Sequence, residues 1–171
     1  MPVRLQLIVS SLLLATVAAA PVFAQSSATP ATQPLAVAAQ ASPAADAAAQ
    51  VVDTFMTDIA SGQFEAARQL MTPDAVVLAN GQVLGDRDGY INGAAKGDAA
   101  ALRATTQREL LHRNAKAGAD LGWVVSEKRL HSTVAGAQAP REIMVTETML
   151  LARTAGGWKI THIHWSTRQA G

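Results

Sequence analysis

The chain has 171 residues, no cysteine, and nearly balanced charge, with 14 basic and 13 acidic side chains. The absence of cysteine excludes disulfides, so the hydrophobic core must hold the fold together. The balanced charge excludes the strongly basic class of proteins that bind nucleic acids, and no polyanionic partner is expected.

Residues 1–24 have the pattern of a secretory signal peptide. Arg4 precedes an apolar run over residues 5–20, and a small residue, a spacer and a small residue end the segment at Ala24. The pattern predicts cleavage after Ala24 and a periplasmic or secreted protein. The run is too short to be preferred as a membrane span, so no membrane contact is expected. Loss of Arg4 with this leader changes 14 basic and 13 acidic side chains to 13 of each.

Residues 25–43 consist mostly of Ala, Pro, Gln, Ser and Thr and contain almost no large apolar side chain. Such a segment buries too little apolar surface to offset the entropy of ordering it, so it is predicted to be a flexible linker. Residues 44–171 then have the length of one ordinary domain.

Two helices are predicted at the start of this domain. Ser42 has the side chain of an N-cap, Pro43 suits the first helical position, and apolar residues recur at helical spacing up to Gly62. A second, short helix is expected over residues 64–71, before Pro73.

A hairpin and a third helix are predicted next. Asn80-Gly81 is typical of a two-residue type I′ turn between short strands over residues 75–79 and 82–84. Asp86 is the expected N-cap of a third helix, which Gly93 and Gly97 weaken.

The second half of the domain is predicted to be mainly strand. Apolar and polar side chains alternate over residues 123–131, 143–151 and 158–168. Residues 102–117 are rich in Leu, Arg, Gln, Glu and Ala, and their local propensity favours a helix.

The last two strands give a testable register. With a turn at Ala155-Gly156, Glu147 is expected opposite His164 and Met149 opposite His162, all four on one face. A turn one residue later moves the partners but keeps the face. Either way, a carboxylate is expected within cross-strand reach of an imidazole.

Several segments resemble the SnoaL-like, NTF2-like superfamily, including its small DUF4440-type bacterial members. They are Val51-Val52-Asp53, Pro73-Asp74-Ala75, Asn80-Gly81, Trp123 to Glu127, Thr146-Glu147-Thr148 and the final Gly157 to Ser166. The resemblance implies an α+β cone in which a curved antiparallel sheet wraps over three N-terminal helices and encloses a pocket. It also implies that residues 103–117 form a strand, that the protein forms a homodimer through the sheet, and that no cofactor or metal is needed. The catalytic Tyr and Asp pattern of the superfamily's ketosteroid isomerases cannot be placed on this sequence.

The candidate site combines ionisable groups from three strands with an apolar wall. His162, His164 and Glu147 are the candidate catalytic residues, because a histidine held by a carboxylate can act as a general acid or base. The candidate ligand-binding residues are Glu127, Tyr90, Arg129, Trp123 and Met149.

Three functions remain open at this point. The first is binding of a small apolar or mildly acidic molecule, with or without cofactor-free acid–base chemistry of the isomerase, cyclase or hydrolase type. The second is a non-catalytic dimeric interaction module in which Glu147 and His164 form a structural network. The third is a metal site built on the His162-x-His164 pair.

Overall fold

The computed structural model describes residues 42–132 and 141–170. The expected signal peptide and nearly all of the expected linker lie outside these residues. The elements follow the order α1 (Pro43–Ser61), α2 (Phe64–Gln69), β1 (Met71–Ala79), β2 (Gln82–Asp86), α3 (Arg87–Asn92), α4 (Ala95–Arg103), β3 (Thr105–Ala117), β4 (Leu121–Ser132), β5 (Arg141–Thr154) and β6 (Gly157–Gln169).

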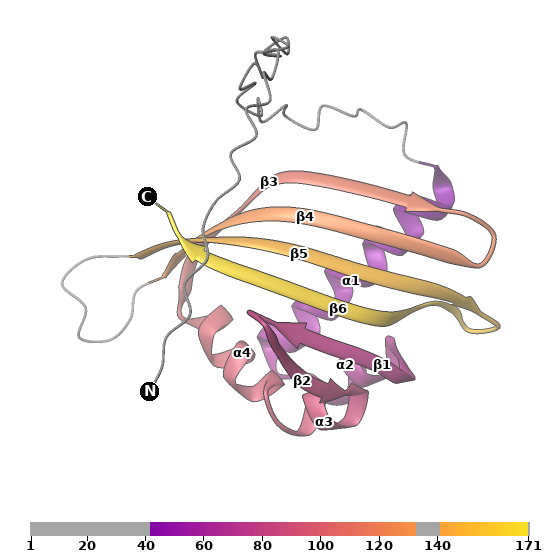
Figure 1. The fold of residues 1–171 in the computed structure, drawn as a ribbon, viewed down its shortest axis with the longest axis horizontal. Helices are drawn as coiled ribbons and strands as arrows, with labels where there is room; N and C mark the ends of the chain where they lie inside the picture. The colour runs from indigo at the N-terminus through magenta and orange to yellow at the C-terminus, as the bar shows by residue number, and fades with distance from the viewer. Residues whose placement is uncertain (1–41, 133–140, 171) are drawn as a thin grey trace, which may run out of the picture. The chain divides into compact units, whose positions relative to one another are not determined.

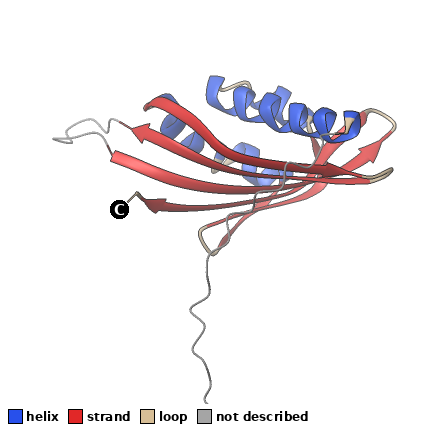
Figure 2. Ribbon diagram, turned by 90° about the horizontal axis from the view of Figure 1, so that it is seen from above, coloured by secondary structure: helices blue, strands red, loops and turns tan. Residues whose placement is uncertain are grey.

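The strands form one six-stranded sheet in the order β2-β1-β6-β5-β4-β3 (Figure 1). Helix α1 runs across one face of this sheet, and Figure 2 shows the layer of helices over the strands. We call the helix-covered face the inner face and the opposite one the outer face. The α+β architecture expected from the resemblance is confirmed. The sheet is antiparallel, as expected, except where β1 pairs with β6 in parallel.

The helix ends lie where the capping residues in the sequence predict them. The Ser42 hydroxyl accepts a hydrogen bond from the Ala45 amide, and Gly62 ends α1 in the left-handed conformation, with φ of 77°. The Asp86 carboxylate accepts from the Gly89 amide at the start of α3. A single third helix was expected here, but the backbone breaks at Gly93 and a separate α4 follows.

The Asn80-Gly81 turn is confirmed. Both residues have positive φ, 49° and 81°, as a type I′ turn requires. This turn joins β1 to β2, which pair as an antiparallel ribbon at one edge of the sheet.

Residues 105–117 form a strand, so the helix favoured by local propensity is wrong there and the resemblance is right. Strand β3 pairs with β4 from Thr105 to Ala117. These cross-strand contacts outweigh a weak local preference, because β structure depends mainly on neighbouring strands. Helix α4 takes up only the first residues of the segment and ends at Arg103.

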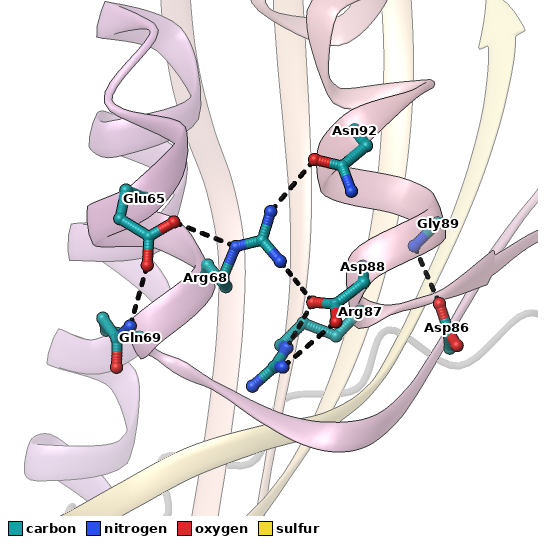
Figure 3. A network of polar contacts seen from close by, with 8 residues as sticks. All are labelled: Glu65, Arg68, Gln69, Asp86, Arg87, Asp88, Gly89 and Asn92. Carbon is teal, nitrogen blue, oxygen red and sulfur yellow. Dashed lines mark hydrogen bonds and ion pairs between the residues drawn. The ribbon is translucent and has the colours of Figure 1, made fainter.

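A polar network fixes α3 against α2 (Figure 3). The Arg68 guanidinium of α2 forms ion pairs with Glu65 and with Asp88 of α3, and it donates to Asn92. Asp88 also accepts from Arg87. This network holds the helix that carries Tyr90.

A β-bulge in β6 decides which side chains reach the inner face. The β5–β6 turn lies where the sequence predicts it, with Thr154 opposite Gly157, and the expected register holds as far as the Leu151–Ile160 pair. The next pair is Leu150 with His162, so Thr161 is an extra residue without a partner.

The expected pairing of Glu147 with His164 is therefore wrong. Glu147 lies opposite Trp165, and Met149 lies opposite Ile163. Because one extra residue exchanges the two faces of a strand, Ile163 is fully buried whereas His164 is exposed.

Deletion of Thr161 tests the role of the bulge. Because Thr161 is the residue without a partner, its removal joins Ile160 to His162 and makes β6 regular, so Ile163 and Trp165 should stay on the inner face. We expect this deletion to change the free energy of unfolding, measured with denaturant, by less than about 1.5 kcal/mol. The matched deletion of Thr148, which is regularly paired on both sides, reverses the side chains on one side of it and should cost about 3 kcal/mol or more. Equal losses in the two deletion variants would contradict this account.

Candidate functional site

A cavity of about 400 Å³ lies against the inner face of the sheet. Helices α1, α3 and α4 contribute to its wall, as do strands β1 and β3 to β6. Its lining residues are Asp53, Met56, Ile59, Ala79, Asn80, Tyr90, Asp98, Ala101, Leu102, Arg108, Glu109, Leu110, Arg113, Lys128, Leu130, Val145, Glu147, Trp165 and Thr167. The volume is within the range of small-molecule pockets, and the lining is apolar with a few convergent polar groups.

A buried carboxylate lies at the centre of the polar part of this lining. Glu147 of β5 is 1% exposed. Its Oε1 atom lies 2.9 Å from Nζ of Lys128 on β4, and its Oε2 atom accepts a hydrogen bond of 3.0 Å from the Trp165 indole on β6. Both oxygens are therefore partnered, as a buried charge requires.

A second ion pair joins α1 to the sheet beside the first. Both terminal nitrogens of Arg113 on β3 bind the Asp53 carboxylate of α1, at 2.8 and 2.7 Å, and Arg113 Nε donates to Ser126. The hydrogen bonds to Asp53 raise the pKa of Arg113, and the negative charge of Glu147 acts in the same direction. The two ion pairs thus belong to one electrostatic cluster.

The third polar feature is a tyrosine–aspartate pair. Tyr90 of α3 is fully buried, and its hydroxyl donates a hydrogen bond of 2.9 Å to Asp98 of α4. The Tyr90 ring packs between Phe55 and Trp165, with centroid distances of 6.5 and 5.8 Å. Burial raises the pKa of Tyr90, and the nearby Asp98 adds to the shift. Burial also raises the pKa of Asp98, against the opposing effect of the Tyr90 hydrogen bond.

The structure brings together only some of the residues singled out in the sequence. Glu147 and Tyr90 line the cavity. Met149 is fully buried in the hydrophobic core. His162 and His164 do not line the cavity and face outwards, because of the bulge at Thr161.

The predicted face of β4 is also wrong. Its inner side chains include the buried Val124 and Ser126, and the remaining three predicted residues alternate with these on the outer face. They are Trp123, Glu127 and Arg129. Lys116 lies over the Trp123 ring at 5.9 Å, and Arg129 pairs with Glu109 at 3.2 Å.

Four functional candidates were missed in the sequence: Asp53, Asp98, Arg113 and Lys128. Lys128 lies on the opposite face of β4 from Glu127 and the other residues predicted there. Apolar side chains occupy both faces of that strand, so the alternating pattern alone does not show which face is the inner one. Arg113 resembles a solvated residue of an edge strand until Asp53 of α1 is seen beside it. In the sequence, Asp53 is marked only by its position directly after Val51 and Val52, on the helix that packs on the sheet.

Comparison with known families identifies the family to which this chain belongs. A family model described as a SnoaL-like domain matches residues 48–169. The chain belongs to the SnoaL-like family. No curated protein matches the chain in sequence.

Solved structures share the fold of this SnoaL-like domain. A candidate ketosteroid isomerase from Shewanella frigidimarina is 26% identical with a TM-score of 0.63, and the match covers 70% of this chain and 94% of the other. A candidate NTF2-like dehydratase from Streptomyces avermitilis is 20% identical with a TM-score of 0.57, covering 74% and 96%. The CaMKII hub of S. rosetta is 18% identical with a TM-score of 0.59, covering 76% and 98%.

A cluster of metal ligands and a membrane-spanning helix are both absent from the described ranges 42–132 and 141–170. No group of three or more His, Asp or Glu side chains there could hold a metal ion, which leaves the His162-x-His164 hypothesis without further ligands. In the same ranges, no helix has the length and apolar character needed to span a membrane.

The raised pKa of Asp98 predicts a pH dependence of stability. The folded protein binds the Asp98 proton more tightly than the unfolded chain, whose aspartates titrate near 3.8. Stability that comes from this proton is present below the unfolded pKa and is lost as the pH rises through the folded pKa. The variant Asp98→Asn, which can still accept from Tyr90, should therefore gain stability relative to the parent as the pH increases from about 3 to 7.

Denaturant unfolding at several pH values measures this difference. The variant Asp74→Asn, at an exposed position of β1, controls for the change in net charge. A difference between parent and Asp98→Asn that stays constant across the range would contradict the raised pKa.

Proposed function

We propose that this domain binds a small apolar or mildly acidic molecule in the cavity on the inner face. The observation that carries the proposal is an apolar cavity of about 400 Å³ whose polar lining is gathered around the buried Glu147 carboxylate. Met56, Ile59 and Leu130 offer apolar surface to the body of a ligand, and the Lys128 and Arg113 groups offer hydrogen bonds to its polar end. We further propose that the protein is exported, which rests on residues 1–24 alone.

Filling the cavity should abolish binding. Ala101 and Ala100 are neighbouring exposed residues of α4, but only Ala101 lines the cavity. We expect the parent to bind the uncharged dye Nile red with enhanced emission, and Ala101→Trp to weaken this binding at least about tenfold, because the indole occupies the ligand volume.

The matched variant Ala100→Trp adds the same side chain outside the cavity and should bind the dye like the parent. Titration followed by dye fluorescence measures both affinities. If the two tryptophan variants bind Nile red equally well, the dye does not occupy this cavity.

Acid–base turnover is a second candidate function, favoured by the Tyr90–Asp98 pair. Asp98 lines the cavity, makes no ion pair within the described ranges, and has a pKa that burial raises above the ordinary value of an aspartate. Such a carboxyl group can exchange a proton with a bound molecule without a cofactor. The names of two structural relatives, an isomerase and a dehydratase, are consistent with proton-transfer chemistry.

This second candidate moves the acid–base role from His162 and His164 to Asp98. The two histidines lie outside the cavity lining, so they cannot contact a ligand bound there. The pH series on Asp98→Asn also tests this candidate, because an ordinary Asp98 pKa would remove its physical basis.

We also propose that the outer face mediates homodimerisation. Strand pairing places Val76, His162, Leu150 and Trp123 in one row across the sheet, and Leu78, His164, Thr148 and Val125 in the next. We call these eight residues the outer patch. Three of its apolar side chains are 38–42% exposed: Val76, Val125 and Leu150. A contiguous patch of this kind marks an interaction surface, and the likeness to the CaMKII hub supports a second copy as the partner.

A charge in the middle of the outer patch should separate the subunits. We expect Leu150→Asp to weaken association at least about a hundredfold, because two buried carboxylates would face each other without partners. Sedimentation velocity over a concentration series measures the change. The control Val83→Asp, at a 70% exposed position of β2 outside the patch, should leave the sedimentation coefficient unaltered. A parent protein that sediments as a monomer at all concentrations would rule out this interface.

A further inference from the structure

We propose that Lys128 selects the ligand, and that the ligand carries a carboxylate group. This inference rests on the proposed binding function and adds the chemical class of the ligand and the residue that recognises it. The juxtaposition that carries it is a lysine side chain in the cavity lining, paired on its buried side with a carboxylate whose oxygens are both already partnered.

The hydrogen bonds of the cluster leave donors but no unpartnered carboxylate oxygen. Glu147 receives one bond on each oxygen, from Lys128 and Trp165. Asp53 likewise receives one bond on each oxygen, from Arg113. A lysine ammonium has three N–H groups, and Glu147 is the only partner found for Lys128 in the described ranges. Two donors of Lys128 are thus available to a ligand, which must supply acceptors.

Lys128 is held in place at this point. Its side chain is 18% exposed, whereas that of Glu147 is 1% exposed, so the ammonium lies between the buried carboxylate and the cavity. Glu147 in turn is fixed from the other side by the Trp165 indole. A long flexible side chain normally loses entropy when it binds a ligand, and an ammonium already restrained by Glu147 loses less.

The charges of the lining favour an anion over an uncharged acceptor. Lys128 and Arg113 are each balanced by one carboxylate, and Glu109 is paired with Arg129. Of the two remaining acidic or basic side chains of the lining, Asp98 accepts from the Tyr90 hydroxyl, and burial raises its pKa and so favours its neutral form. The other, Arg108, donates to the Leu102 carbonyl and has no acidic partner in the part of the chain that the structure describes. A ligand carboxylate would pair with this cationic side of the cavity, and hydrogen bonds from charged donors to a carboxylate are stronger than those to a neutral oxygen.

Two probes of the same shape separate charge from apolar contact. 4-Phenylbutanoate and 4-phenylbutan-1-ol share a phenylpropyl body and differ in the terminal carboxylate or alcohol. We expect the parent protein, as the full chain at pH 7, to bind the carboxylate at least about tenfold more tightly in calorimetric titrations.

Changes to the ion pair should then move the two affinities apart. In Glu147→Gln the Lys128 charge is no longer neutralised, so carboxylate affinity should rise about threefold or more. In the double variant Lys128→Met with Glu147→Gln the cation is removed and no buried charge is left unpaired, so carboxylate affinity should fall at least about tenfold. Alcohol affinity should change less than carboxylate affinity in both variants, since the apolar contacts remain and a hydroxyl oxygen forms a weaker hydrogen bond with a charged donor than a carboxylate does.

A matched lysine controls for net charge. Lys116 lies over Trp123 on the outer face, so Lys116→Met removes the same charge away from the cavity and should change neither affinity. A merely structural role of the Lys128–Glu147 pair would lower both affinities together in both variants, and that result would overturn the proposal.

The remaining outcomes distinguish this inference from the function on which it rests. Equal binding of the two probes to the parent, or a carboxylate preference that survives in the double variant, overturns the role of Lys128 while Nile red still reports the cavity. Failure of both probes and of Nile red overturns the binding function itself, and the carboxylate inference with it.

Discussion

The site depends on the burial of one charge, the carboxylate of Glu147. A carboxylate with 1% exposure on the central strand β5 must be paired and hydrogen-bonded, because an unpaired buried charge costs several kcal/mol. Its two partners come from the strands on either side, Lys128 on β4 and Trp165 on β6. The requirement therefore fixes the register of three strands and at the same time places an ammonium group at the cavity.

The register that satisfies Glu147 exists only because of the bulge at Thr161. A regular β6 would set His164 opposite Glu147 and turn Trp165 outwards. The extra residue instead places the Trp165 indole opposite the carboxylate, where its N–H donates a hydrogen bond and its ring packs against Tyr90. Bulges commonly re-aim side chains next to functional sites, and this one contributes to both faces of the sheet. It gives the cavity its aromatic wall and gives the outer patch its two histidines.

The two faces of the sheet consequently have separate chemistry. The inner face combines apolar surface with two ion pairs and the Tyr90–Asp98 pair, which suits a bound molecule. The outer face combines exposed aliphatic side chains with His162 and His164, which suits a protein surface. A shared fold does not fix a function, so in this SnoaL-like domain the function has to be inferred from these side chains.

The sequence by itself determined the local features whose signals are carried by a few adjacent residues. The Ser42 cap, the Asn80-Gly81 turn and the start of the last hairpin follow from rules of backbone conformation that act over two to four positions. Alternation predicted the last three strands, and the resemblance in the final strand predicted the family and the strand at residues 105–117, against local propensity. Glu147 and Tyr90 were also identified at this level.

Only the tertiary structure decided which faces meet in the cavity. The bulge at Thr161 has no signature that distinguishes it in the sequence, and a shift of one residue reverses every later side chain of the strand. Strand β4 has apolar residues on both faces, so the choice of Lys128 over Glu127 depends on which face α1 covers. Pairs such as Asp53 with Arg113 join residues that are distant in the chain, and their proximity arises from packing rather than from any local pattern.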